Sequence, residues 1–187
     1  FIFIFSVGPE KETLSLLGIG ILWTLLLLSS TLSLRKFYQD DFESGNIVIM
    51  HLSGLSLELI TILKTLSHFI FVQIPFLISI PVACILINIP LDKIYYLSIS
   101  FIIGSLILSC LGSISSSMNL LNDRNYLLGS VIVMIFSIPI IIFSVEIINI
   151  ENNFNSLVSI LFGILLIIFA INPWASGACL KLALENN

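Results

Sequence analysis

Long apolar stretches separated by short polar segments dominate the chain. A bilayer core about 30 Å thick needs roughly 20 apolar residues to cross it as a helix. Several stretches approach that length, and none shows the strict alternation of polar and apolar residues expected of an outer-membrane β-barrel strand. The pattern therefore predicts five complete membrane-spanning helices, over residues 13–34, 59–87, 94–118, 126–145 and 157–174.

A further apolar stretch at residues 1–7 is too short to cross a bilayer. Gly8-Pro9-Glu10 ends it, and it lacks the basic start and the small-residue cleavage site of a signal peptide. We interpret residues 1–7 as the remnant of a first helix that is truncated here. The predicted fold class is all-α: a polytopic transmembrane helix bundle with six helices in the intact protein, forming a single transmembrane domain over residues 1–187.

Composition supports a membrane environment. Hydrophobic residues make up 58% of the chain and charged residues only 10%, whereas soluble domains carry about 25% charged residues. So few charges cannot cover a water-facing globule. The net charge is −4, and no stretch of the chain is basic enough to suggest nucleic-acid binding.

The basic residues predict an orientation. With spans that alternate in direction, Arg35, Lys36, Arg124 and Lys181 fall on one side, as does Lys64 if its side chain snorkels to the headgroups. Lys11 and Lys93 fall on the other side. The positive-inside rule then places the first side in the cytoplasm.

The polar segment 35–58 holds the densest charges of the chain. A helix over residues 35–52 would gather Tyr38, Phe42, Gly45, Ile49 and Leu52 on one face, which predicts an amphipathic helix at the cytoplasmic membrane surface. A solvated loop with chance periodicity is the alternative. Gly45 lowers helix propensity by about 1 kcal/mol, so it also marks a candidate break or close contact.

Lys64 and His68 stand four residues apart near the start of the second complete span, and are candidate polar groups within the membrane. Intramembrane ionisable residues often have functional roles, although Lys64 can also snorkel to the headgroups. His68 and His51 are chemically able to ligate haem iron, but neither lies in an aromatic-rich setting that favours such a pocket.

Other chemistry is weakly represented. Asp40-Asp41 and Glu43 are too few for an acid-rich metal site, and no histidine or cysteine lies at ligand spacing. The sequence contains no GxxxxGK[ST], GxSxG, HExxH or CxxCH motif. We therefore predict no catalytic, cofactor-binding or metal-binding residues in this chain, and no ATP binding through a phosphate loop.

Small and helix-bending residues mark two spans. Ser105, Ser109, Ser113 and Ser117 recur every four residues beside Gly104 and Gly112. Such a row favours close helix packing, with a polar path as the alternative. Pro75, Pro81 and Pro139 lie inside predicted spans, where each removes a helical hydrogen bond.

Several features in order resemble the CcmB family, the haem exporter protein B of cytochrome c maturation, over essentially the whole chain. They are Ser6-Val7-Gly8-Pro9-Glu10, Trp23, Leu34-Arg35-Lys36-Phe37-Tyr38-Gln39-Asp40-Asp41 with Gly45, Lys64 with His68, and Asn172-Pro173-Trp174-Ala175. Relatives often carry Ser-Pro where this chain has Asn172-Pro173.

The resemblance implies an ABC-2 type permease in the bacterial inner (cytoplasmic) membrane, or alternatively in the mitochondrial inner membrane. Its ATP would be hydrolysed by a separate subunit, CcmA, with CcmC and CcmD as further partners and two permease copies per complex. The haem chaperone CcmE would be served indirectly. Haem would be a transported or partner-held ligand and not a cofactor of this chain.

A permease without a nucleotide site must receive force through a cytoplasmic surface, and residues 35–58 form the only substantial one predicted here. We expect Arg35, Asp40, Asp41, Glu43 and Gly45 to contact the ATPase. Two other functions stay open: an ABC-2 permease for a lipid, drug or polysaccharide, and a non-transporting assembly subunit of a membrane complex. A neighbouring ATPase gene would separate both ABC functions from the last.

Overall fold

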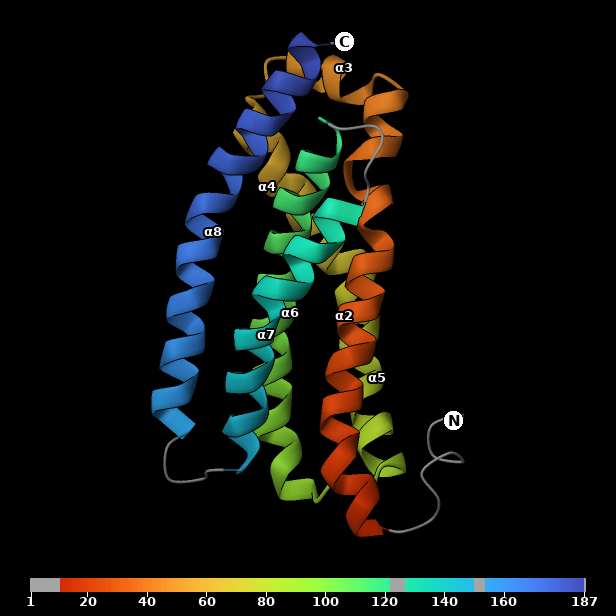
Figure 1. The fold of residues 1–187 in the computed structure, drawn as a ribbon, viewed down its shortest axis with the longest axis vertical. Helices are drawn as coiled ribbons and strands as arrows, with labels where there is room; N and C mark the ends of the chain where they lie inside the picture. Colours follow the sequence, from red (N-terminus) through yellow and green to blue (C-terminus); the bar gives the residue numbers. More distant parts are fainter. Residues whose placement is uncertain (1–10, 122–126, 150–153, 187) are drawn as a thin grey trace.

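The computed structural model describes residues 11–121, 127–149 and 154–186, and within them the chain folds as an all-helical bundle (Figure 1). Five helical segments are long and apolar enough to cross a membrane: Leu17–Glu43, Leu57–Leu86, Lys93–Asn119, Gly129–Glu146 and Phe154–Glu185. The predicted spans and fold class are confirmed. The predicted helix remnant at 1–7 and the basic residue Arg124 lie outside the described residues.

The helices alternate in direction along the bundle (Figure 1). Helix α2 (Lys11–Glu43) leads to the short α3 (Asn46–Leu52). The chain then runs in the opposite direction through three consecutive helical segments: α4 (Leu57–His68), η1 (Phe69–Gln73) and α5 (Ile74–Leu86). Helices α6 (Leu91–Asn119), α7 (Leu127–Asn149) and α8 (Phe154–Glu185) complete the bundle. As a result, α3 and the C-terminal end of α8 lie at the same end of the molecule.

Helix α6 forms the centre of the bundle. It packs along α2, α7 and α8, and it is the most buried of the five spans. The residues of the serine and glycine row are buried on it, and Gly104 lies against the ring of Trp23 while Gly112 lies against Leu34. Small side chains let the helix backbones approach closely, so the packing interpretation of this row is confirmed.

Helix ends and interruptions differ from the prediction at two places. The last span does not end at Asn172-Pro173, because α8 continues through Pro173 to Glu185. A proline inside a membrane helix is tolerated where neighbouring groups satisfy the freed backbone. In the second complete span, the π-helical turn η1 immediately precedes α5, which has Pro75 in its first turn. The missing N–H of Pro75 gives a physical reason for this local widening.

Candidate functional site

The end of the bundle that carries α3 is shaped by a sharp break after α2. Gly45 adopts a left-handed backbone with φ of 74° between α2 and α3, and Gly54 has φ of 97° after α3. Left-handed backbone favours glycine because it lacks a Cβ. Ser56 then caps α4, with its hydroxyl accepting a hydrogen bond from the Leu59 N–H at 3.3 Å.

The predicted single amphipathic helix over 35–52 is therefore wrong, because its two halves belong to different helices. Residues 35–43 continue the membrane-spanning α2, and only 46–52 form α3. The expected common apolar face is also divided: Tyr38 is fully buried, whereas Ile49 and Leu52 are 64% and 81% exposed. The helix break predicted at Gly45 is confirmed.

Helix α3 has one anchored side and one free apolar side. Ile47 is fully buried in a small cluster with Phe37, Tyr38, Leu57, Ile60 and Leu180. This cluster fixes α3 against α2, α4 and the last turns of α8. The opposite side exposes Val48, Ile49 and Leu52, an apolar surface suited to a membrane or a partner protein.

The residues predicted for partner contact have different surroundings. Asp40 and Glu43 are exposed, and Glu43 accepts a hydrogen bond from the Gln39 amide at 2.6 Å. Asp41 turns inward and is ion-paired with Lys64 of α4. Arg35 belongs to α2, but its side chain lies outside the described part of the structure. Exposed Asp40 and Glu43 thus remain available to a partner, while Asp41 ties α2 to α4.

The two predicted intramembrane polar residues both have partners. Lys64 does not simply snorkel; its ammonium meets the Asp41 carboxylate, and the side chains are 22% and 24% exposed. His68 is buried, with Nε2 hydrogen-bonded to the Ser33 hydroxyl at 2.6 Å and Nδ1 to the Ser109 hydroxyl at 3.1 Å. Both ring nitrogens are therefore engaged in hydrogen bonds to hydroxyl groups.

His68 joins three helices. Ser33 belongs to α2, Ser109 to α6 and His68 to the last turn of α4, immediately before η1. The Phe37 ring stacks on the imidazole with ring centroids 4.7 Å apart. Hydrogen bonds of this kind give buried polar groups their partners inside a membrane protein. The arrangement therefore holds the start of the π-helical turn between α2 and α6.

A second polar network includes residues of α8 and connects four helices. Tyr38 and Ser113 share a hydrogen bond of 2.8 Å, and Ser113 and Ser176 share one of 3.2 Å. The Ser176 hydroxyl donates to Asn172 Oδ1 at 3.0 Å, and Asn172 Nδ2 donates to Thr65 Oγ1 at 2.9 Å. Residues of α2, α6, α8 and α4 are thus linked in one buried chain.

Two hollows flank Lys64. One, of about 200 Å³, is lined by Ser33, Lys36, Phe37, Lys64, Ser67, His68, Phe71 and Val72. The other, of about 330 Å³, is lined by Asp41, Met50, Leu55, Ile60, Leu63, Lys64 and Ser67. The first faces two lysines and the second faces the Asp41–Lys64 pair.

Potential metal ligands and thiols are dispersed over the part of the chain that the structure describes. There, no three His, Cys, Asp or Glu side chains converge on one point. Cys84, Cys110 and Cys179 are free thiols, and Cys84 and Cys110 are buried. The site at this end of the bundle is therefore one of ion pairs, hydroxyl hydrogen bonds and apolar packing.

The chain is similar to known proteins over nearly its whole length. The family described as CcmB protein matches residues 1–183. The chain is 32% identical over 184 residues to heme exporter protein B of Paracoccus denitrificans, covering 97% of this chain and 84% of that protein. Heme exporter protein B of Bradyrhizobium diazoefficiens is 31% identical over 185 residues, covering 97% and 83%. That of Rhodobacter capsulatus is 28% identical, covering 97% and 84%.

Proposed function

The chain belongs to the CcmB protein family, and from this membership we propose that it is the permease subunit of an ABC complex that exports haem for c-type cytochrome biogenesis. The observation that carries the proposal is the family match over residues 1–183. The relatives that cover nearly the whole chain are named heme exporter protein B. The five helices of the described residues that are long and apolar enough to cross a membrane agree with a multi-pass membrane subunit.

ATP hydrolysis is assigned to a separate subunit, CcmA, because the sequence contains no GxxxxGK[ST] phosphate loop. We place the contact with that subunit on the surface formed by Asp40, Glu43 and α3. The exposed side of α3 offers an apolar patch, and the two exposed carboxylates of the last α2 turn would fix the register of a docked partner. The purified chain, free of partners, should show no ATP turnover.

Contacts between helices connect this surface to the membrane-spanning part of the bundle. Helix α2 runs without a break to Glu43, next to α3. The Asp41–Lys64 pair links α2 to α4, and the network through Tyr38 and Asn172 links α2 to α6 and α8. A displacement of α3 would therefore move several helices together.

A mechanical role fits the charge distribution better than a complete haem channel in this subunit. Haem carries two propionates, and a path for it needs cationic groups near them. Within the described spans, Lys64 is the cation closest to the bundle interior, and it is paired with Asp41. We propose that helix movement remodels a complex in which CcmC, CcmD or CcmE holds the haem, with two permease copies per complex.

We place the protein in the bacterial inner membrane with α3 and the C-terminal end of α8 in the cytoplasm, on the basis of the positive-inside rule. Single-cysteine variants Ser44→Cys and Asn155→Cys, in a background without the three native cysteines, test this orientation. A membrane-impermeant thiol reagent should label them from opposite sides. Labelling of both from the same side would overturn the proposed topology.

The haem step can be tested in a strain that lacks the gene. If the complex releases the haem-loaded chaperone, CcmE with bound haem should accumulate; if the complex supplies haem, CcmE should stay empty. Both results support a haem-handling role and separate its two forms. Unchanged CcmE loading together with normal c-type cytochromes would instead favour a permease for another lipid or drug.

A further inference from the structure

The smaller hollow beside Lys64 is lined by two lysines and by apolar side chains. Its volume is about 200 Å³, and its lining includes Lys36 of α2, Lys64 of α4, and Phe71 and Val72 of η1. None of the described residues that line it is acidic. The side chains of two lysines thus border a hollow whose described lining carries no negative charge.

This hollow lies at the border between the apolar and polar parts of the bundle. Residues 13–34 of the chain contain no charged residue, and Arg35 and Lys36 follow directly after that run. Just inside this border, Leu32 and Phe71 are 73% and 78% exposed. Large apolar side chains so exposed in a membrane protein face lipid, and lysines beside them face the headgroups.

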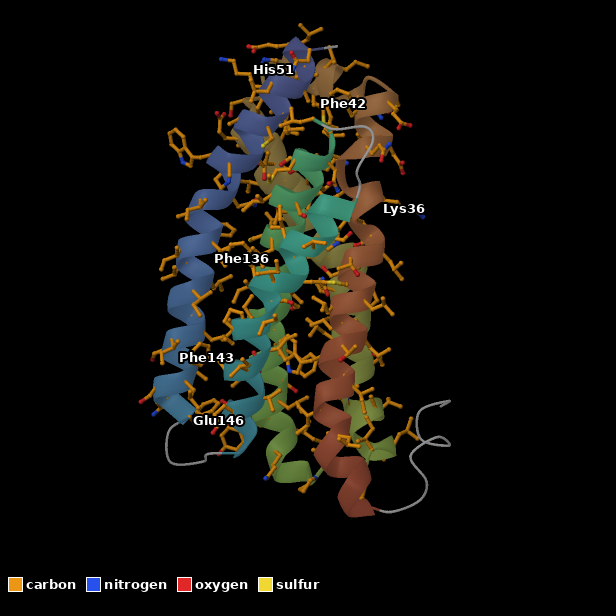
Figure 2. All side chains as sticks on the ribbon, in the orientation of Figure 1. Lys36, Phe42, His51, Phe136, Phe143 and Glu146 are labelled. Carbon is orange, nitrogen blue, oxygen red and sulfur yellow. The ribbon has the colours of Figure 1, made fainter. Side chains whose placement is uncertain are left out.

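The charges around the hollow leave Lys36 available. The ammonium of Lys64 is shared with Asp41, which lines the neighbouring hollow. Asp40 and Glu43 also lie on α2, but Asp40 is exposed and Glu43 is bonded to Gln39. Lys36 has no ion pair or hydrogen bond with any described residue, and Figure 2 shows it projecting from the outer side of α2.

We propose that this hollow is a binding site for the headgroup of an anionic phospholipid. The phosphodiester would lie between Lys36 and Lys64, and the first acyl carbons would rest on Phe71 and Val72. Basic pockets between membrane helices bind acidic headgroups by this chemistry.

A lipid bound at this site would lie beside η1 and would contact the helices around it. His68 forms part of the same lining and holds α4 to α2 and α6 through Ser33 and Ser109. A lipid held by Lys36 and Lys64 would bridge α2 and α4 on the membrane side of that contact. This inference concerns lipid binding alone and does not depend on the proposed haem function.

Native mass spectrometry of the purified full-length protein, in the complex in which it is expressed, tests the site with phosphatidylglycerol as the probe. The wild-type protein should retain phosphatidylglycerol in preference to phosphatidylcholine. Lys36→Gln should weaken retention about fivefold, the effect expected for one basic residue near the membrane surface. Lys36→Arg, which keeps the charge, should retain the lipid.

Two controls separate the site from general effects. Lys181→Gln removes an exposed lysine of α8 that does not line the hollow, and it should leave retention unchanged. The double variant Asp41→Asn/Lys64→Gln removes the ion pair as a unit and should lower retention as Lys36→Gln does. Each single variant should melt at the wild-type temperature, and the double variant should still assemble into the complex in detergent micelles that contain phosphatidylcholine.

Three results would overturn the inference. Equal loss of lipid in Lys36→Gln and Lys181→Gln would show only diffuse charge attraction. Equal retention of phosphatidylcholine and phosphatidylglycerol would show that the anionic headgroup is not recognised. Inorganic phosphate or haemin at matched concentration could displace the lipid from the wild-type protein. If Lys36→Gln abolished that displacement, the hollow would be assigned to a soluble anion or to haem.

Discussion

The Asp41 carboxylate of α2 is ion-paired with the Lys64 ammonium of α4, and the two residues lie on either side of α3 in the sequence. Asn46, the first residue of α3, also donates a hydrogen bond from Nδ2 to Asp41 Oδ1 at 3.2 Å. Asp41 therefore joins the end of α2, the start of α3 and the middle of α4.

Removing one member of this pair should destabilise the protein more than removing both. Lys64→Gln or Asp41→Asn alone leaves a partly buried charge without its partner, at a cost of about 1–2 kcal/mol in unfolding free energy. The double variant should recover part of that loss. Melting temperatures of the four proteins in one detergent give the coupling, and strictly additive shifts would show that the pair contributes nothing.

The Asn172 amide should matter for packing between α8 and α4. Asn172→Ala removes the hydrogen bonds to Thr65 and Ser176, and it should lower the unfolding free energy by about 1–2 kcal/mol. Asn155→Ala is the matched control, because Asn155 is exposed on the same helix and Ala raises helix propensity at both positions. Equal melting temperatures for the two variants would contradict a stabilising network.

Close packing of α2 and α6 can be tested at Gly104. A methyl group added there would overlap the ring of Trp23, which is buried and stacked on Phe101 at 4.4 Å. Gly104→Ala should therefore cost about 1–3 kcal/mol through overpacking. Gly20→Ala, where nothing lies within 4 Å of the added methyl, should stabilise α2 by up to about 1 kcal/mol. A stable Gly104→Ala protein would show that Trp23 yields easily.

The break at Gly45 should be needed for coupling to the ATPase. Its φ of 74° penalises a side chain, although no atom lies within 4 Å of an added methyl group. Gly45→Val should therefore displace α3 and lower transport-linked ATPase activity while the protein still inserts into the membrane. Asn tolerates left-handed backbone, so Gly45→Asn should retain most activity. Full activity of Gly45→Val would place the ATPase contact elsewhere.

The sequence predicted the spans well because hydropathy directly reflects which residues face lipid. Their starts and ends were less predictable. The 35–43 segment is polar enough to resemble a separate surface helix, yet Phe37 and Tyr38 are buried and continue α2. The last span was predicted to end at residue 174, next to Pro173, but α8 continues through this proline to Glu185.

Polar partners across helices could not be predicted in the same way. Lys64 and His68 were recognisable as unusual residues within a span, but their partners lie on other helices. Asp41 pairs with Lys64, and Ser33 and Ser109 bond His68, at sequence separations that no local pattern reveals. The serine row indicated close packing, while its additional role in hydrogen bonding became visible only from the arrangement of the helices.

Covalent haem attachment to c-type cytochromes measures the proposed role most directly. In a strain lacking the gene, haem-stained c-type cytochromes should disappear while b-type cytochromes stay at wild-type levels, and the wild-type gene should restore them. The distinction between the two classes excludes a general loss of haem supply. Normal c-type cytochromes in the deletion strain would contradict a function in cytochrome c maturation.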